Sequence, residues 1–281
     1  MTRGTRAGRD GFILVTVLWM VLALAGLAGV YALYLGNTAA GAGARAEVFP
    51  AGGLGHAAVE LAAFRLAGVP RDARPAVDAF SFPMGRAQVA VAARDETARI
   101  DLNAAPAELV AALFETLGAP ADAAQGYAAR VIGWRSAETS EAADAEADLY
   151  RSAGLDYGPR GAPFVHADEL WRVVGLPPRL VAAALPHVTV YSGRAQIDPA
   201  IADPVVAAAA TLARRTASGG LDTPPELPGD RADAVRVTAD IVLAGGRRRT
   251  LEAVILLRPF ADAPYRTLYW REAAAGSSRR W

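Results

Sequence analysis

The chain has 281 residues, of which 53% are hydrophobic and 21% charged, so it is long and apolar enough to fold around one or two cores. Its 29 basic residues, all arginine, balance 29 acidic residues, and the net charge of zero excludes an overall basic field that would attract nucleic acid. The absence of cysteine excludes disulfides, thiolate nucleophiles and cysteine-ligated metals.

The first element in chain order is a long apolar run. Residues 12–35 carry no charge, and as a helix they would span roughly 36 Å, against about 30 Å for a hydrocarbon core. Three arginines and one aspartate precede the run, so the positive-inside rule predicts a cytoplasmic N-terminus and an exported domain. A cleaved signal peptide is the alternative, but the run is longer than a typical signal-peptide core. We therefore predict one transmembrane helix.

A glycine closes the basic leader and a phenylalanine opens the apolar run. This pair, Gly11-Phe12, resembles the processing site of type IV prepilins and pseudopilins, which a prepilin peptidase cuts before the new N-terminal Phe is methylated. Most members of that superfamily carry Glu four residues after the Phe, where this sequence has Thr16. The resemblance implies a prepilin-type leader over residues 1–11 and a subunit better suited to a filament's end than to its shaft.

The next segment is predicted to continue as a kinked helix to residue 68, because glycines and a proline interrupt it. Residues 68–83 are rich in turn-forming residues and are predicted to form a connection. Alternating apolar residues then predict two strands, over residues 87–91 and 98–102, joined as a hairpin by the polar residues 94–96.

A mostly helical block is predicted from Pro106 to Pro186. Asn103 is expected to cap its first helix, with Pro106 in the first turn. Further helices are predicted over residues 121–135, 168–174 and 178–185, with an acidic loop after the first of them.

The last part of the chain returns to strands. They are predicted over residues 188–191, 234–243, 250–257 and 267–270, with a short helix over residues 205–214. Because helices interrupt the strands and do not alternate with them, we predict an α+β fold in which an antiparallel sheet carries an inserted all-helical domain.

Five carboxylates are concentrated in the predicted acidic loop: Glu138, Glu141, Asp144, Glu146 and Asp148. Calcium takes six to eight oxygen ligands from flexible clusters of this kind, so these residues are a candidate calcium site. A solvated acidic loop without a metal is the alternative. The three histidines show no metal-ligand spacing and the chain lacks the common hydrolase and Walker motifs, so no enzymatic activity is predicted.

Short motifs follow one another from residue 100 to the C-terminus. They are Ile100-Asp101-Leu102-Asn103-Ala104-Ala105-Pro106, Trp134-Arg135, Tyr157-Gly158-Pro159, Ala162-Pro163-Phe164, Asp168-Glu169-Leu170, Val174-Gly175-Leu176, Thr189-Val190-Tyr191 and Pro264 to Glu272. With the leader and the apolar run, they resemble the K-type minor pseudopilin of the bacterial type II secretion system, or general secretion pathway protein K. Lack of Glu at position 16 is itself a trait of that family.

This resemblance implies the domain organisation. A transmembrane and amphipathic helix over residues 12–68 would precede a pilin-like α+β domain over residues 84–104 and 187–281, with the helical domain inserted over residues 105–186. The protein would be a single-pass inner-membrane protein with a cytoplasmic N-terminus and a periplasmic C-terminal domain.

The resemblance also implies partners and a role. The partners would be the I- and J-type minor pseudopilins, the major pseudopilin, the prepilin peptidase and the inner membrane. At the tip of the pseudopilus the protein would help to initiate assembly and protein export across the outer membrane. K-type relatives bind calcium near the acidic segment; Glu146 and Tyr150 match part of their motif, whereas Ser136 and Glu138 replace its two Asp.

A membrane-anchored nucleic-acid-binding protein of the competence type is the alternative. Leu102-Asn103-x-x-Pro106 followed by a helix resembles a helix-hairpin-helix module, whose Gly-apolar-Gly turn presents amides to phosphate. Here the turn reads Leu117-Gly118-Ala119-Pro120, which lacks the second Gly, and Pro120 has no amide donor. Since the chain is also neutral overall, no nucleic acid partner is expected.

Overall fold

The computed structural model describes residues 15, 17–27, 52–136, 141–217, 232–258, 260 and 263–274. The chain divides into two compact units, Met1–Gly53 and Leu54–Trp281. In the first unit, residues 17–27 are helical and exposed. None of the helices within the described ranges is long and apolar enough to cross a membrane. The leader, the Gly11-Phe12 pair and parts of the predicted transmembrane run lie outside the described residues.

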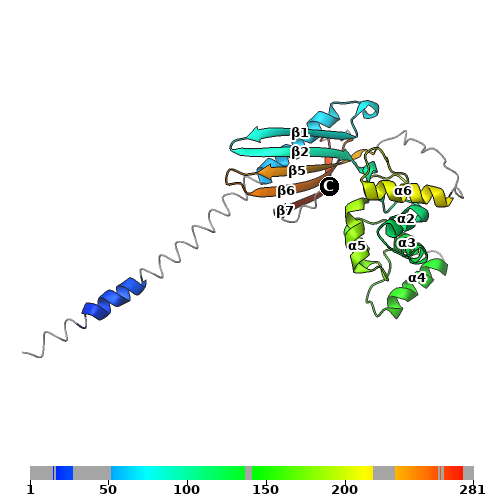
Figure 1. The fold of residues 1–281 in the computed structure, drawn as a ribbon, viewed down its shortest axis with the longest axis horizontal. Coiled ribbons are helices and arrows are strands. Elements are labelled where there is room, and N and C mark those ends of the chain that lie inside the picture. Colours follow the sequence, from blue (N-terminus) through cyan, green and yellow to red (C-terminus); the bar gives the residue numbers. More distant parts are fainter. Residues whose placement is uncertain are drawn as a thin grey trace, which may run out of the picture. The chain divides into compact units, whose positions relative to one another are not determined.

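The second unit contains a five-stranded antiparallel sheet in the order β1-β2-β5-β6-β7 (Figure 1). Its strands are β1 (Val77–Met84), β2 (Ala87–Asp95), β5 (Ala234–Val242), β6 (Arg248–Leu256) and β7 (Arg266–Ala274). Strand β2 pairs directly with β5, although all the helices from α2 to α6 lie between them in the sequence. The predicted helical insertion in an antiparallel sheet is therefore confirmed.

One face of this sheet packs against the helix over residues 54–67. Every second residue of β5 is buried in their common core, whereas Arg236 and Thr238 between them face the other side. A Cβ on Gly55 would lie 3.1 Å from the Leu251 side chain, which shows how closely the helix approaches β6. Burial of each Val or Leu side chain in such a core stabilises the fold by about 1.5–3 kcal/mol.

The prediction that residues 68–83 form a connection is wrong in its second half, because strand β1 begins at Val77. Only their first part consists of turns and a short 3-10 helix, η1 (Arg71–Ala73). Phe80 and Phe82 then alternate with exposed residues and pack against the sheet core, which is the period-two pattern of a strand. Because proline is uncommon in strands, Pro83 favoured the prediction of a connection, but a proline is tolerated on an edge strand.

The predicted hairpin between residues 87–91 and 98–102 is wrong. Strand β2 continues to Asp95, whose carboxylate accepts hydrogen bonds from the Thr97 N–H and hydroxyl at 2.9 and 2.8 Å. This bonding starts a 3-10 turn, η2 (Glu96–Ala98), that takes the chain out of the sheet. Strand β3 (Ile100–Asp101) then pairs in parallel with β4 (Val188–Thr189) in a separate two-stranded sheet.

The helices form a second body with its own core, which extends from Ile100 to Ala210. Helix α6 packs against α2, so this helical body includes residues beyond 186 that were predicted to belong with the sheet. Its elements are α2 (Ala107–Thr116), α3 (Ala121–Arg135), α4 (Glu141–Ser152), η3 (Ala167–Arg172), α5 (Pro178–Ala184), η4 (Leu185–His187) and α6 (Pro204–Ala217).

Two local predictions in this body need correction. The acidic segment continues as helix α4 and is not a loop, because it reads EAADAEAD and alanine and glutamate are strong helix formers. The segment predicted as a helix over residues 168–174 is the 3-10 turn η3, which ends at Arg172 before Val173 adopts an extended conformation.

Candidate functional site

The motif at residues 100–106 lies where three segments of the helical body meet. Asp101 is buried, and its Oδ1 accepts the Asn103 and Ala104 N–H groups at 2.7 and 3.3 Å. Its Oδ2 accepts the Ser192 hydroxyl at 2.9 Å and the Gly193 N–H at 2.7 Å. One carboxylate therefore orders the turn that leads into α2 and also holds the segment after β4.

Asn103 does not cap the first helix, contrary to prediction. Pro106 occupies the N-cap of α2 without a side-chain bond, whereas Asn103 pairs with the backbone of Phe164. Its Nδ2 donates to the Phe164 carbonyl at 2.9 Å and its Oδ1 accepts the Phe164 N–H at 2.7 Å. This arrangement is a two-bond clip between segments 61 residues apart.

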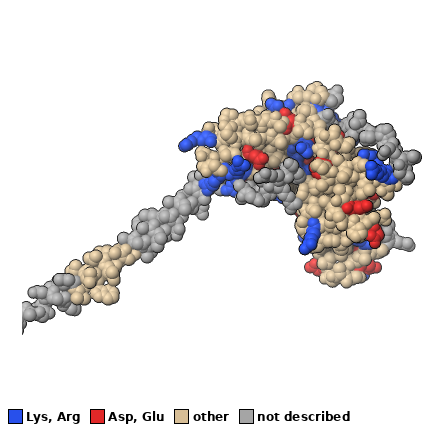
Figure 2. All heavy atoms as spheres, in the orientation of Figure 1, with Lys and Arg blue, Asp and Glu red and all other residues tan. Residues whose placement is uncertain are grey.

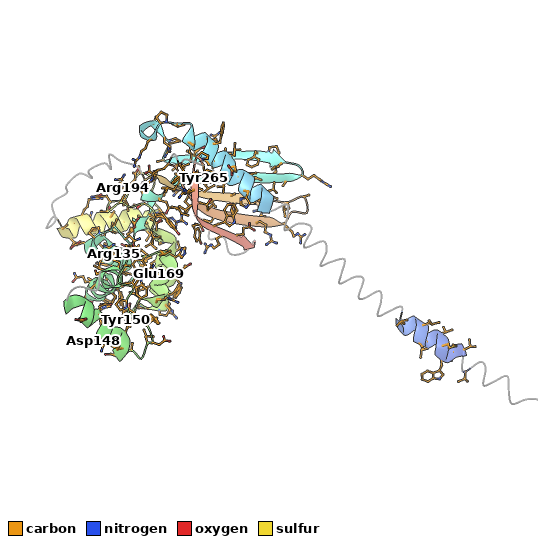
Figure 3. The ribbon with its side chains drawn as sticks, turned by 180° about the vertical axis from the view of Figure 1, so that it is seen from behind. Arg135, Asp148, Tyr150, Glu169, Arg194 and Tyr265 are labelled. Atoms are coloured by element: carbon orange, nitrogen blue, oxygen red, sulfur yellow. The ribbon has the colours of Figure 1, made fainter. Side chains whose placement is uncertain are left out.

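The Trp134-Arg135 motif at the end of α3 completes the same junction. Arg135 lies within the helical body (Figure 3). It donates to the carbonyls of Leu102 and Ala105, the latter at 2.7 Å, and burial lowers its pKa. The Trp134 indole donates to Glu169 at 3.1 Å. The motifs that were distant in the sequence therefore form one hydrogen-bonded framework.

A charged junction joins this framework to the sheet. We use that name for Glu96, Arg236, Glu252 and Arg271. Arg236 on β5 donates to Glu96 Oε1 and Oε2 at 2.6 and 3.1 Å, and to Glu252 Oε1 on β6 at 2.6 Å. Arg271 on β7 donates to Glu252 Oε2 at 3.0 Å. Since Glu96 also accepts the hydroxyl of Thr189 on β4, the junction connects both sheets.

The electrostatics of the junction follow from its burial. Desolvation alone would lower the pKa of Arg236, but the charges of Glu96 and Glu252 outweigh it and raise the pKa above its usual value. Burial tends to raise the pKa of Glu252, yet Arg236 lowers it overall. Burial and the neighbouring Arg236 lower the pKa of Arg99 to about 10. Arg236 and Glu252 therefore each favour the charged form of the other.

A cleft of about 500 Å³, lined by both charged and apolar side chains, opens beside the charged junction, between the sheet and the helical body. Tyr191 and Tyr269 contribute to its walls, and burial raises the pKa of Tyr191 to about 12. The main acids and bases of the cleft are paired with one another, so this arrangement is suited to holding the helical body on the sheet. Sequence reasoning missed it, although Arg236 and Glu252 each stand between two apolar residues of a predicted strand.

Only three of the five candidate calcium ligands have described side chains, and these three do not come together. Glu138 and the Glu141 side chain lie outside the described part of the chain. Asp144 and Asp148 are exposed on α4, and Asp148 pairs with Arg151. Acidic side chains lie at the surface of the helical body (Figure 2).

Glu146 is the one buried member of the acidic run among those described. Its Oε2 accepts a hydrogen bond from Arg130 at 2.6 Å, and its Oε1 is buried without a hydrogen-bond partner among the described residues. A buried carboxylate oxygen without a hydrogen-bond partner could bind a cation, but calcium takes six to eight oxygen ligands. No group of three metal-ligating side chains occurs in the described ranges, and because the Glu138 and Glu141 side chains lie outside them, the calcium site stays a prediction.

The turn between α2 and α3 does not present free amides to a phosphate. The N–H groups of Leu117, Gly118 and Ala119 donate back to carbonyls of α2 at 3.0, 2.9 and 3.0 Å, and the next residue is Pro120. Gly118 adopts a positive φ of 97°, as expected for a helix C-terminus. The geometry does not favour the helix-hairpin-helix alternative.

Comparison with known proteins matches this part of the chain. Residues 89–193, which include β2, the 100–106 motif and most of the helical body, match the family described as type II secretion system (T2SS), protein K. A chain in the crystal structure of the GspK-GspI-GspJ complex from the enterotoxigenic Escherichia coli type 2 secretion system is similar in fold, with a TM-score of 0.57 and 17% identity. The alignment covers 81% of this chain and 96% of that one. No curated protein matches the sequence. The family match confirms the resemblance predicted from the motifs.

Proposed function

We propose that this protein, whose residues 89–193 match the type II secretion protein K family, is a minor pseudopilin that stands at the tip of the pseudopilus. There it helps to initiate assembly and protein export across the outer membrane, as a structural component without catalytic activity. Its partners are the I- and J-type minor pseudopilins and, below them, the major pseudopilin. The similar fold found in a GspK-GspI-GspJ complex supports this choice of partners.

The observation that carries the proposal is the insertion of the helical body between β2 and β5. A pilin-like sheet alone is suited to stacking along a filament, whereas this chain adds a second core that, in the described residues, is larger than the core of the sheet. The charged junction links that body to the sheet, and the Asn103 clip joins two segments within the body. A bulky block of this kind is compatible with a filament end, where no further subunit has to be added above it.

The anchor and its processing belong to the same proposal. The apolar run at residues 12–35 holds the protein in the bacterial inner membrane with its C-terminal domain in the periplasm. A prepilin peptidase cuts between Gly11 and Phe12, and Phe12 becomes a methylated N-terminus. Thr16 in place of the usual Glu supports a position at the tip.

The test is N-terminal mass analysis of the full chain, expressed with and without a prepilin peptidase. We expect a chain beginning at methylated Phe12 only when the active peptidase is present. A Gly11→Ala variant that stays uncut serves as the matched control. An intact Met1 in both samples would defeat the assignment as a processed pseudopilin.

A further inference from the structure

The two hairpin turns of the five-stranded sheet lie at the same end of it. Strand β1 passes into β2 through Gly85-Arg86, and β5 passes into β6 through residues 243–247. Gln88 at the start of β2 lies opposite Val242 at the end of β5, so the two turns are neighbours (Figure 1). The helical body is connected at the opposite end of β2 and β5.

This turn end of the sheet is basic. Residues 83–88 and 241–249 contain four arginines and no acidic residue. We use the name basic end for three of these arginines: Arg86, Arg248 and Arg249. Its first two members are exposed, and Figure 2 shows basic side chains gathered at this end of the sheet. The nearest carboxylate on β5 or β6 is that of Asp240, which accepts the Thr250 hydroxyl at 2.8 Å.

The turns fix where these arginines lie. In the β5–β6 turn, the Leu243 N–H donates to the Arg247 carbonyl and the Gly246 N–H donates to the Leu243 carbonyl, both at 2.9 Å. Two residues before Arg86, at the tip of the other hairpin, the apolar side chain of Met84 is 49% exposed. A surface that combines cations with an exposed apolar side chain is suited to the headgroup region of a bilayer.

The chain enters the second unit from the same end. A Cβ on Gly55 would contact Leu251, the fourth residue of β6. Farther along the same helix, Arg65 bonds to Asp78, which lies at the far end of β1 from its turn. The helix over residues 54–67 therefore begins near the basic end and runs away from it.

The connection to the predicted membrane span is short. Only residues 36–53 separate this helix from the apolar run over residues 12–35. As an unbroken helix they would span about 27 Å, and the glycines and Pro50 within them favour a bend that shortens this distance. The basic end is therefore within reach of the bilayer surface.

We propose that the basic end binds the anionic phospholipid headgroups of the membrane in which the chain is anchored. The arginines are attracted by the negative surface potential of such lipids, and Met84 enters the headgroup layer beside them. Because the anchor belongs to the same chain, it keeps the bilayer at a high effective concentration around the basic end, whereas a free anion would have to bind from solution. This proposal rests on the proposed function, which supplies the anchor.

The experiment places a fluorescent label on a single introduced cysteine, since the chain has none of its own. Gly245→Cys labels the β5–β6 turn, where an added Cβ has open space. Ser152→Cys, exposed at the end of α4 on the helical body, is the matched control. The full chain is reconstituted in nanodiscs that carry a headgroup-attached quencher, made of phosphatidylcholine alone or of phosphatidylcholine mixed with phosphatidylglycerol.

The label at position 245 should be quenched about threefold more strongly in the anionic discs than in the neutral ones. The label at position 152 should show no difference. High salt should remove the difference at position 245, because it screens the attraction between the arginines and the lipids.

A pair of double variants tests the arginines themselves. Arg86→Gln with Arg248→Gln should reduce quenching in the anionic discs to the level of the neutral ones. Arg71→Gln with Arg258→Gln removes two exposed arginines at the opposite end of the sheet and should leave the lipid dependence unchanged.

Equal quenching at position 245 in both kinds of disc would overturn the lipid proposal alone, because it would reflect the tether and not the charge. Inorganic phosphate that abolishes the difference at constant ionic strength would identify a site for free anions and overturn the choice of lipid. A chain that is not retained in either kind of disc would instead overturn the membrane anchor of the proposed function.

Discussion

Glu96 and Arg236 are separated by 140 positions in the sequence, yet their side chains form a two-bond ion pair at 2.6 and 3.1 Å. Glu96 begins the segment that leaves the sheet for the helical body, and Arg236 lies on the strand to which the chain returns. Glu96 is only 1% exposed. The pair therefore closes the insertion at its base, in a site from which water is largely excluded.

Removal of the Glu96 charge should strongly destabilise the second unit. In Glu96→Gln the Arg236 guanidinium stays buried with Glu252 as its remaining carboxylate, so we expect a loss of about 3 kcal/mol in the free energy of unfolding, measured in urea. The double variant Glu96→Leu with Arg236→Met removes both charges. Its loss in the free energy of unfolding should be smaller than the sum of the losses in the two single variants. A loss below about 1 kcal/mol for Glu96→Gln would show that the pair does not stabilise the junction.

The Asn103 clip should contribute through its two backbone hydrogen bonds. Asn103→Ala leaves the Phe164 N–H and carbonyl without these partners, and we expect the free energy of unfolding, measured in urea, to fall by about 2 kcal/mol. Asn103→Asp replaces the donor with a second acceptor that faces the Phe164 carbonyl, next to the buried Asp101, so it should destabilise at least as much as Asn103→Ala. Gln88→Ala, on an exposed position of β2, is the control and should lie within about 0.5 kcal/mol of the parent. Equal stabilities for the Asn103 and Gln88 variants would contradict the clip.

Two glycines of α3 should respond in opposite ways to the same substitution. A Cβ on Gly133 would lie 2.8 Å from the Glu146 carboxyl carbon, so Gly133→Ala should displace Glu146 from Arg130 and lower the melting temperature. Gly126 has nothing within 4 Å of such a Cβ, and Gly126→Ala should stabilise by about 0.5–1 kcal/mol through helix propensity. Thermal unfolding of the two variants side by side measures the difference. Similar shifts of the same sign would mean that α3 does not pack on Glu146.

Acid should weaken the charged junction. The folded-state pKa of Glu252 is lowered by Arg236, and that of Asp203 is lowered by its bonds to His187 and to backbone N–H groups, in both cases against the effect of burial. A depressed carboxyl pKa gives stability that is present above the unfolded-state values of about 4 and lost as the pH falls below them.

The free energy of unfolding, measured in urea, should therefore fall between pH 6 and 3. It should depend less steeply on pH in Glu252→Gln than in the exposed control Glu272→Gln. A parent protein whose stability stays constant or rises over this acid range would contradict the assignment of these two carboxylates.

Calcium should have little effect on the acidic helix. The described carboxylates of the acidic run are either exposed or paired with Arg130 and Arg151, so we expect no calcium uptake by the full chain in isothermal titration and no change in melting temperature with a chelator. Uptake that Glu138→Gln and Glu141→Gln abolish, and Gln125→Ala does not, would restore the calcium hypothesis for this segment.

Features with a local cause could be predicted from the sequence. Helix α3 lies where its composition predicted it, residues 121–135, and β5 and β6 agree with their apolar alternation to within two residues. The family resemblance depended on short motifs, and it is confirmed. Strand β1 was missed because a proline and turn-forming residues outweighed a short alternation, although an edge position makes that proline harmless.

What only the tertiary structure decided is how distant segments meet. The sequence by itself determined the apolar run, the order of the elements and the presence of an insertion, since these depend on local propensity and periodicity. It could not determine that Glu96 leaves an expected hairpin to meet Arg236, that Asn103 binds Phe164 and not its own helix, or that β1 is an edge strand. Those outcomes depend on which charges and backbone groups are buried together, and packing decides burial only when the whole chain is folded.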